Sequence, residues 1–158
     1  MPVPEFVRDL RAHVGHAPLW LPGVSAVVVD DDGLVLLTRR ADNGLWAIVS
    51  GILEPGEEPG PAVLREIREE TGIDAELVRI TGVDTAGPIT YPNGDVASYL
   101  DVCFLARAVS GEAHAADDEN LEVRWFSPDE LPADMTASST SRLTAALRGD
   151  ERAWFARE

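Results

Sequence analysis

The arrangement that most constrains the fold is a series of strand-like segments on both sides of one central helix. Short runs rich in valine, leucine and isoleucine, separated by turn residues, are typical of strands. These runs cover residues 24–29, 34–38, 45–49, 75–83, 89–91, 96–109 and 121–126. The helix follows a loop at 51–60; Pro61 suits its first position and Gly72 its C-terminal cap. This order predicts an α/β (α+β) fold with a mixed central sheet sandwiched between helices.

Helices are also expected at the two ends of the chain. Phe6, Leu10 and Val14 recur on one side of a helix over residues 5–16, and residues 136–147 form a closing helix. A chain of 158 residues suits one compact domain. We expect that domain to combine an N-terminal helical segment, a core, and a C-terminal helix with a tail, at residues 1–20, 21–135 and 136–158.

The charge balance limits the partners of this chain. It carries 28 acidic and 13 basic residues, a formal net charge of −15, and every basic residue is arginine. Such a surface repels nucleic acid polymers and anionic membranes, so we expect a small-molecule partner. The absence of lysine excludes a P-loop, which needs one. An acidic protein that handles an anionic substrate needs a metal ion between the two.

Nothing in the sequence indicates export or insertion into a membrane. No run approaches the roughly 18 consecutive apolar residues that span a bilayer. The first ten residues include Glu5 and Asp9 and lack the apolar core of a signal peptide. We therefore expect a cytoplasmic protein. The single cysteine, Cys103, rules out an intramolecular disulfide and a cysteine-rich zinc site, and its apolar neighbours favour a place in the core.

The central helix carries a concentration of carboxylates. At about 100° per residue, Glu66, Glu69 and Glu70 project within an arc of about 100°. Their mutual repulsion requires a compensating positive charge. The adjacent arc is apolar and consists of Val63, Leu64 and Ile67. The carboxylates are therefore expected to face a cleft beside the sheet, where hard oxygen ligands suit Mg²⁺ or Mn²⁺. Read alone, the helix also fits a solvated face with ordinary ion pairs.

The spacing around this helix favours the metal interpretation. Gly51 is followed after five residues by Glu57, after seven more by Arg65-Glu66-Ile67, and then by Glu69-Glu70 and Gly72-Ile73, with one residue in each later gap. This order resembles the Nudix box, G-x5-E-x7-R-E-U-x-E-E-x-G-U with U aliphatic, at every position. Such a match arises by chance in a chain of this length on the order of once in a million.

The resemblance extends from about residue 23 to residue 132. Residues 36–40 and 44–46 are similar to the family's approach to the box, and residues 124–132 to its late strand and turn. One departure is the tripeptide Val49-Ser50-Gly51, where many members have Pro-Gly-Gly. The resemblance implies the Nudix fold and the metal-dependent cleavage of a phosphoanhydride by water. A non-catalytic nucleotide sensor on the same fold is a remote alternative, since every box carboxylate is present.

The resemblance also implies roles for individual residues. The metal ligands would be the Gly51 carbonyl and the carboxylates of Glu66, Glu69 and Glu70. Glu57 and Arg65 would pair to lock the loop onto the helix, and Gly72 would permit the turn that follows. The catalytic candidates are Glu66, Glu69 and Glu119. Glu66 is the first candidate for activating water, and Glu119, in the acidic stretch 117–120, is its competitor.

Substrate contacts are the least constrained part of the prediction. Arg39 and Arg40 are candidates for a phosphate or a base edge, and surface positions fit them equally well. Trp46 and Tyr91 are candidates for stacking on a base, although core packing suits each of them too. The N-terminal helix with Trp20 and the terminal Trp154-Phe155 offer contacts for a homodimer; a monomer fits equally well.

Two substrate classes remain open. Pro88, fifteen residues beyond Ile73, resembles the downstream proline of members that cleave ADP-ribose. Residues 38–41 instead resemble members that remove oxidised nucleoside triphosphates, the MutT type. We expect an ADP-ribose or nucleotide-sugar substrate, with nucleoside triphosphates as the alternative.

Overall fold

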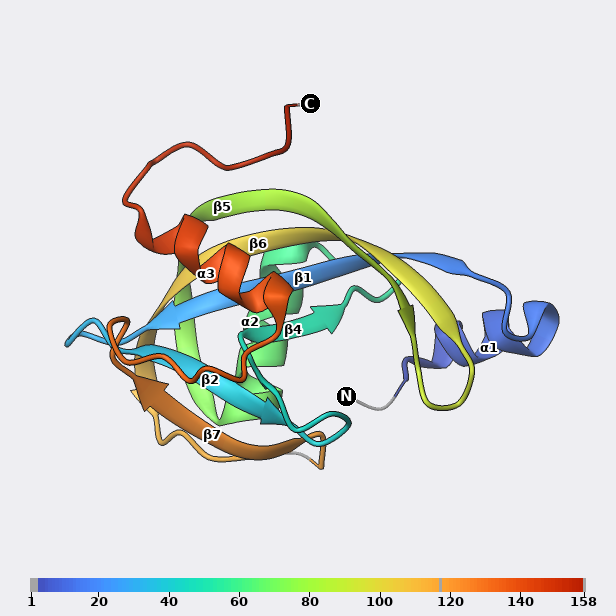
Figure 1. Cartoon of the computed structure of the whole chain (residues 1–158), viewed down its shortest axis with the longest axis horizontal. Helices are drawn as coiled ribbons and strands as arrows, with labels where there is room; N and C mark the ends of the chain where they lie inside the picture. Colours follow the sequence, from blue (N-terminus) through green and yellow to red (C-terminus); the bar gives the residue numbers. More distant parts are fainter. Residues whose placement is uncertain (1–2, 117, 158) are drawn as a thin grey trace.

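The computed structural model describes residues 3–116 and 118–157. The elements follow one another as α1 (Glu5–Val14), β1 (Leu19–Val29), β2 (Val35–Arg40), β3 (Trp46–Ala47), β4 (Val49–Ile52), α2 (Pro59–Thr71), β5 (Ile73–Thr90), β6 (Val96–Gly111), β7 (Asn120–Phe126) and α3 (Ala137–Leu147). Figure 1 shows this course, with β5 and β6 forming a long curved hairpin. Among the described residues no helix is long and apolar enough to cross a membrane.

The sheet is mixed and separates into two wings. In the first wing β1 pairs in parallel with β6 along its whole length, β6 pairs antiparallel with β5, and β4 pairs antiparallel with β1. In the second wing β2 lies antiparallel to both β3 and β7. The wings join where β1 turns into β2, and these two strands pair only at Val29 and Val35. Beyond this pair β2 diverges from β1. Towards the start of β1, at residues 23–26, β4 takes the place of β2 as the neighbouring strand.

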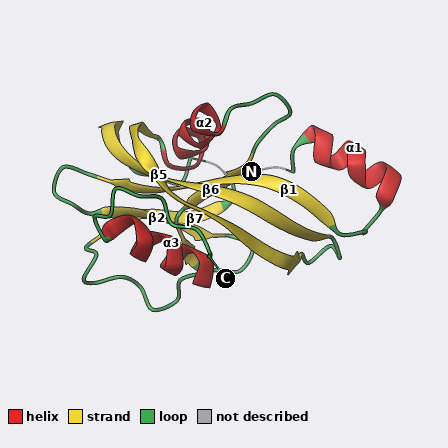
Figure 2. Ribbon diagram, turned by 90° about the horizontal axis from the view of Figure 1, so that it is seen from above, coloured by secondary structure: helices red, strands yellow, loops and turns green. Residues whose placement is uncertain are grey.

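Helices cover the two faces of this arrangement. In Figure 2 the strands run between α2 on one side and α3 on the other, while α1 lies beyond the end of β1. Each face has its own buried cluster. The cluster under α2 contains Val24, Ala26, Val28, Leu36, Val49, Ala62, Val63, Ile67, Ile73, Phe104 and Ala106. The cluster under α3 contains Val27, Val35, Leu37, Trp46, Ile48, Cys103, Leu143 and Ala146. The predicted mixed sheet between helices is confirmed.

The first strand is longer than the apolar run that predicts it. Residues 24–29 are the predicted strand, whereas β1 begins at Leu19 and continues through Pro22. Parallel pairing with β6 starts at Leu19 and Ala97, so tertiary contacts extend the strand beyond its local signal. The Pro22 carbonyl accepts a hydrogen bond from the Leu53 amide at 3.3 Å, which gives the polar main chain there a partner.

The predicted strand over residues 45–49 is two strands in the structure. Trp46 and Ala47 pair with β2, whereas Val49 begins a separate pairing with β1 that ends at Ile52. The chain thus crosses from one wing to the other at Ile48. As a result Gly51 lies in a strand, and the loop predicted over residues 51–60 is shorter than expected.

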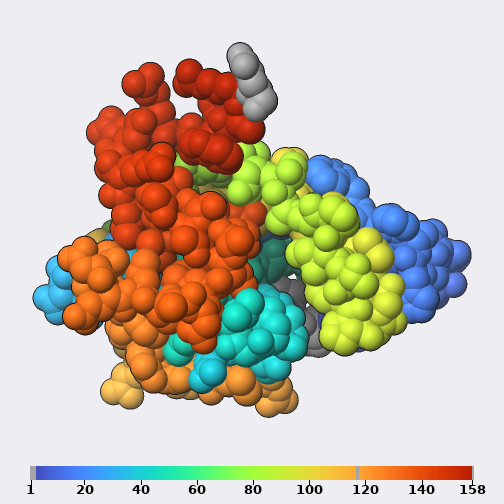
Figure 3. Space-filling view, in the orientation of Figure 1, coloured from blue at the N-terminus to red at the C-terminus, as the bar shows by residue number. Residues whose placement is uncertain are grey.

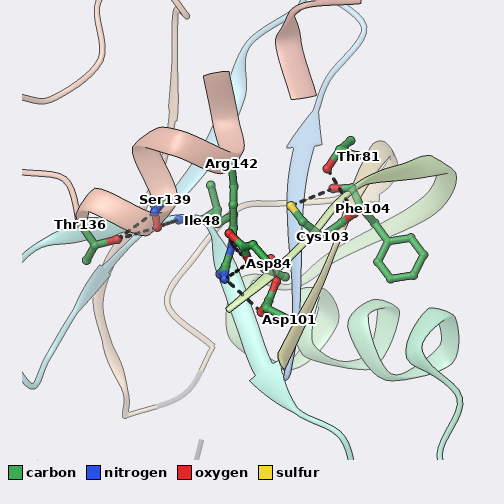
Figure 4. Close-up of polar contacts among 10 residues, drawn as sticks. Ile48, Thr81, Asp84, Asp101, Cys103, Phe104, Thr136, Ser139 and Arg142 are labelled. Atoms are coloured by element: carbon green, nitrogen blue, oxygen red, sulfur yellow. Dashed lines mark hydrogen bonds and ion pairs between the residues drawn. The ribbon is translucent and has the colours of Figure 1, made fainter. Parts of the chain in front are cut away.

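An ionic network fastens α3 to the sheet (Figure 4). Arg142 on α3 is 9% exposed and donates to Asp84 of β5 at 2.7 Å, and its other terminal nitrogen lies 3.4 Å from Asp101 of β6. The second Asp101 oxygen accepts from the Ser25 hydroxyl at 2.6 Å. Burial raises the pKa of Asp101, and the Arg142 charge opposes that rise. The network joins one helix to three strands.

Candidate active site

The box glycine lies directly against a box glutamate. A Cβ placed on Gly51 would overlap the Glu66 carboxylate and its Cγ. β4 therefore approaches α2 closely only because residue 51 has no side chain. The main chain of Gly51 and the carboxylate of Glu66 are brought together, as the site predicted from the sequence requires.

Glu66 is fully buried, with 0% of its surface exposed. One oxygen accepts a hydrogen bond from Arg65 at 2.8 Å, whereas Oε2 is buried and has no hydrogen-bond partner. Burial raises the pKa of Glu66 to about 7, with the Arg65 charge acting in the opposite direction. An unpaired buried carboxylate oxygen is costly, and a cation is the partner that best offsets that cost.

Arg65 organises three carboxylates around the box. Its Nε and Nη2 donate to the two oxygens of Glu57, each at 2.9 Å, which is a bidentate ion pair. Its Nη1 reaches Glu66 at 2.8 Å and Glu69 at 3.1 Å. The Arg65 hydrogen bonds lower the pKa of Glu57. The loop is thereby joined to α2, and three of the box carboxylates share one cation.

Glu70 connects the helix to the second wing. It is 5% exposed, and Asn120 at the start of β7 donates to its Oε2 at 3.2 Å. Glu119 precedes Asn120 and is partly buried; its carbonyl accepts from the Ala41 amide at 2.7 Å. The acidic stretch before β7 therefore lies beside the C-terminal turn of α2. Asp117, which opens that stretch, lies outside the described residues.

Gly72 ends α2 as a left-handed cap. Its φ is 71°, and its amide donates to the Arg68 carbonyl at 3.0 Å. A side chain at this φ is strained, so glycine is needed where the helix turns into β5.

These residues fit a hard divalent cation, although they form no ready-made cage. In the described part of the chain no three acidic, histidine or cysteine side chains already converge as metal ligands. Glu69 is exposed and engaged by Arg65. The donors available here are nevertheless all oxygens, as Mg²⁺ and Mn²⁺ prefer. They are the unpaired oxygen of Glu66, the main-chain carbonyl of Gly51 and the carboxylate of the buried Glu70.

Comparison with known proteins shows the family. The NUDIX domain model matches residues 19–147. The chain belongs to the Nudix hydrolase family. A MutT-like protein of Streptomyces ambofaciens is 38% identical over 84% of this chain and 80% of its own length. An ADP-ribose pyrophosphatase of Methanocaldococcus jannaschii is 34% identical over 79% of this chain and 72% of its own length.

A solved structure has the same fold. The MutT Nudix hydrolase from Burkholderia pseudomallei superposes with a TM-score of 0.68 at 31% identity, over 80% of this chain and 97% of its own. This Nudix protein is accordingly a pyrophosphohydrolase with the α/β Nudix fold. Its relatives differ in the substrates that their names report, so the family alone leaves the substrate open.

The arginine candidates for substrate binding differ in their surroundings. Arg40 forms a bidentate pair with Asp42 at 2.9 and 2.7 Å. That pairing raises the pKa of Arg40 against the effect of burial, and Tyr91 and Glu70 add smaller contributions in the same direction. Arg40 therefore lies within electrostatic reach of the box. Arg39 donates to the Gly44 carbonyl at 3.1 Å and holds the following loop.

The two aromatic candidates are also different. Trp46 is 5% exposed and meets Phe126 edge to face, with ring centroids 4.9 Å apart. Its ring therefore packs in the core and offers little free surface. Tyr91 is half-buried near the tip of the β5–β6 hairpin, with its hydroxyl 2.7 Å from that of Tyr99. Figure 3 shows the surface hollowed between this hairpin, in yellow-green, and the segment near residue 45, in cyan.

Sequence reasoning missed two polar partners. Asn120 contacts Glu70 across 50 residues, and Arg142 contacts Asp84 across 58. The only local signal for Asn120 is its position directly after the acidic stretch, at the start of a strand. No local signal marks Arg142, because its partners are on strands far away in the sequence.

Proposed function

We propose that this Nudix hydrolase cleaves a phosphoanhydride with Mg²⁺ or Mn²⁺ held by the Gly51 carbonyl and by Glu66, Glu69 and Glu70. The observation that carries the proposal is the buried, unpaired Oε2 of Glu66 beside a glycine whose missing side chain makes room for it. The neighbouring Glu70 is buried as well, which adds a second carboxylate on the same face of α2.

The protein's own groups divide the work. When bound, the metal supplies charge neutralisation of the pyrophosphate and a more acidic water molecule. Arg65 holds Glu66 and Glu69 in place through its two short contacts. Asn120 orients Glu70. Water attacks phosphorus, the bond to the leaving phosphate oxygen breaks, and a glutamate accepts the proton of the water.

Glu66 and Glu119 are the two candidates for that proton acceptor. Glu66 is buried next to Gly51, and Glu119 comes from the loop beside the C-terminal turn of α2. A residue that binds the metal is a poorer base than one beside it, because the cation stabilises its deprotonated form. Glu119 therefore suits the role of base, with Glu66 as a ligand.

For the substrate we favour a nucleoside diphosphate linked to another group, of the ADP-ribose or nucleotide-sugar type. Support comes from the relative named ADP-ribose pyrophosphatase and from Pro88 in the hairpin that carries Tyr91. Arg40, whose charge interacts with that of Glu70, offers a cation for a phosphate or base edge. The likeness to MutT proteins supports nucleoside triphosphates, ordinary or oxidised, as the second candidate.

The test is phosphate release, after phosphatase treatment, from a nucleotide panel. The panel holds ADP-ribose, nucleotide sugars, dinucleoside polyphosphates, NADH, and ordinary and oxidised nucleoside triphosphates. Each is assayed with Mg²⁺ or Mn²⁺, with chelator, and after the metal is restored. We expect metal-dependent cleavage that favours ADP-ribose or a nucleotide sugar. A preference for triphosphates would select the second candidate, and cleavage unaffected by chelator would contradict the metal site.

A further inference from the structure

The chain beyond α3 turns back onto β5 and forms, with it, a cavity that is open to solvent and lies away from the box. Its volume is about 670 Å³, inside the range of about 300–1,000 Å³ usual for small-molecule sites. The lining residues that matter here are Thr81, Arg148, Arg152, Trp154, Phe155 and Arg157. None of them belongs to the candidate active site. Figure 1 shows the tail along β5, with α3 at its base.

Main-chain hydrogen bonds fix one wall of this cavity. The Trp154 amide donates to the Thr81 carbonyl at 2.8 Å, and the Val83 amide donates to the Trp154 carbonyl at 2.9 Å. The tail thus adds a short parallel bridge to β5 at Gly82. A Cβ on Gly82 would lie 3.2 Å from the Trp154 carbonyl oxygen, so glycine eases the close approach. The tail therefore has a defined place against the sheet.

The cavity gathers three arginines, of which only Arg152 has a carboxylate partner among the described residues. Within residues 3–116 and 118–157, Arg148 makes no side-chain hydrogen bond or ion pair. Arg152 meets only Asp150, at 3.8 Å, and remains 88% exposed. Arg157 lies over the Phe155 ring, 5.7 Å from its centre. Arg148 is the C-cap residue of α3, where a cation is stabilised by the negative end of the helix dipole. Arg152 and Arg157 lie beyond the helix, so the dipole does not account for them.

This gathering stands out against the rest of the molecule. The chain has a net charge of −15, and several arginines elsewhere are bound to carboxylates, among them Arg40, Arg65, Arg107 and Arg142. Three of the thirteen basic residues instead line one cavity with a single acidic residue, Asp150, among its lining. An anion is attracted to such a place even on an acidic protein.

Two exposed aromatic rings share the same cavity. Trp154 is 48% exposed and Phe155 is 57% exposed. Both rings expose apolar surface whose contact with water is unfavourable, and both lie beside arginines that attract an anion. A ligand that satisfies both features needs a flat ring and a phosphate. We propose that the tail cavity is a second nucleotide site, which binds a free nucleoside monophosphate through arginine–phosphate contacts and stacking of the base.

This inference does not depend on the metal site. A monophosphate is also the kind of product that cleavage of a nucleoside diphosphate derivative releases. A tail site for it would give the protein a place for product outside the catalytic centre. The tail is hydrogen-bonded to Thr81 and Val83 of β5. The next residue of that strand, Asp84, binds Arg142 of α3.

The experiment is calorimetric titration of AMP into protein with excess chelator. The test variant carries Arg148→Gln, Arg152→Gln and Arg157→Gln together. The matched control is Arg107→Gln, which removes an exposed arginine on β6. Because the triple variant removes the three guanidinium groups that would contact the phosphate, we expect it to lose a binding event or weaken it at least about tenfold. The control should bind as the unaltered protein does.

Adenosine and inorganic phosphate distinguish the two halves of the site. Each should bind at least about tenfold more weakly than AMP, because each satisfies only one feature. If the triple variant binds AMP unchanged, or if phosphate alone binds as well as AMP, the nucleotide site is wrong. Should the triple variant fail to fold, Arg148→Gln alone is compared with Arg107→Gln. The rate of hydrolysis by the triple variant should stay within about twofold of that of the unaltered protein. If the nucleotide site is wrong, the proposed hydrolase function therefore still stands.

Discussion

Arg65 and Arg142 each hold a helix in place through two or more carboxylates, but on opposite faces of the sheet. Arg65 joins α2 to the loop before it, whereas Arg142 joins α3 to the strands. Arg65 is 30% exposed and its bidentate partner, Glu57, lies eight residues away. Arg142 is 9% exposed and its bidentate partner, Asp84, lies 58 residues away. The Arg142 network pairs both oxygens of Asp101. The Arg65 network leaves one buried oxygen of Glu66 unpaired.

We propose that this difference separates a network that only stabilises the fold from one that takes part in the metal chemistry. A buried ion pair with every acceptor satisfied holds elements together and needs nothing further. A buried carboxylate with an unsatisfied oxygen is costly to the free protein and is stabilised by a cation. If the two networks differ in this way, substitutions in the Arg142 network should lower stability, and substitutions around Glu66 should lower turnover.

Arg142→Ala should destabilise the protein by about 3–5 kcal/mol, because it leaves the buried Asp101 and the partly buried Asp84 without their cation. Urea unfolding measures this free energy. Adding Asp101→Asn should restore part of the loss, since the second variant removes one unpaired charge. A loss below about 1 kcal/mol would mean that the network is not structural.

Gly51→Ala should lower turnover by about 100-fold, because the new methyl displaces the Glu66 carboxylate. Steady-state rates on the best panel substrate measure the effect, alongside the melting temperature. Gly60→Ala is the control: its Cβ meets only Leu77, at 3.1 Å, in the first turn of α2. Equal rates for the two variants would remove Gly51 from the site.

Arg65→Ala should cost about 1–2 kcal/mol of stability, since it releases Glu57 from a half-exposed bidentate pair and leaves Glu66 without its cation. It should also slow turnover at least about tenfold by freeing Glu66 and Glu69. Arg68→Ala is the matched control on the same helix, because within the described residues its side chain makes only an exposed ion pair, with Asp74 at 3.5 Å. An unchanged melting temperature in Arg65→Ala would argue against the structural role.

The smallest effect is a pH dependence of stability. Arg65 lowers the pKa of Glu57 in the folded protein, so this pair contributes stability above the usual glutamate pKa and loses it as pH falls through the lowered value. Between pH 5 and pH 2.5, Glu57→Gln should therefore lose less stability than the unaltered protein. Urea midpoints across that range measure the difference, and identical pH profiles would contradict the pairing.

A site residue can be predicted from the sequence when its partners are close to it in the chain. The box is a linear pattern, so Gly51, Glu57, Arg65 and the helix glutamates are found from spacing alone. The burial of Glu70 also follows, because it borders the apolar arc of α2. Asn120 and Arg142 escape sequence reasoning because their partners are distant in the chain and only the folded sheet brings them together.

Strand lengths and aromatic roles show the same limit. The local signal for β1 starts at Val24, but pairing with β6 extends the strand back to Leu19. Trp46 fits either a stacking platform or the core from sequence, and its contact with Phe126 favours the core. In each case long-range packing decides between states that the local residues permit equally.

The most direct test of the account is the turnover of Glu70→Gln at saturating Mg²⁺, compared with Glu76→Gln, a control at an exposed glutamate of β5. The substitution keeps the size of the side chain and its contact with Asn120 but removes one charge from the proposed metal site. The account predicts a loss of about 1,000-fold or more, with an unchanged melting temperature and full activity in the control. Near-normal turnover of Glu70→Gln would contradict the metal assignment.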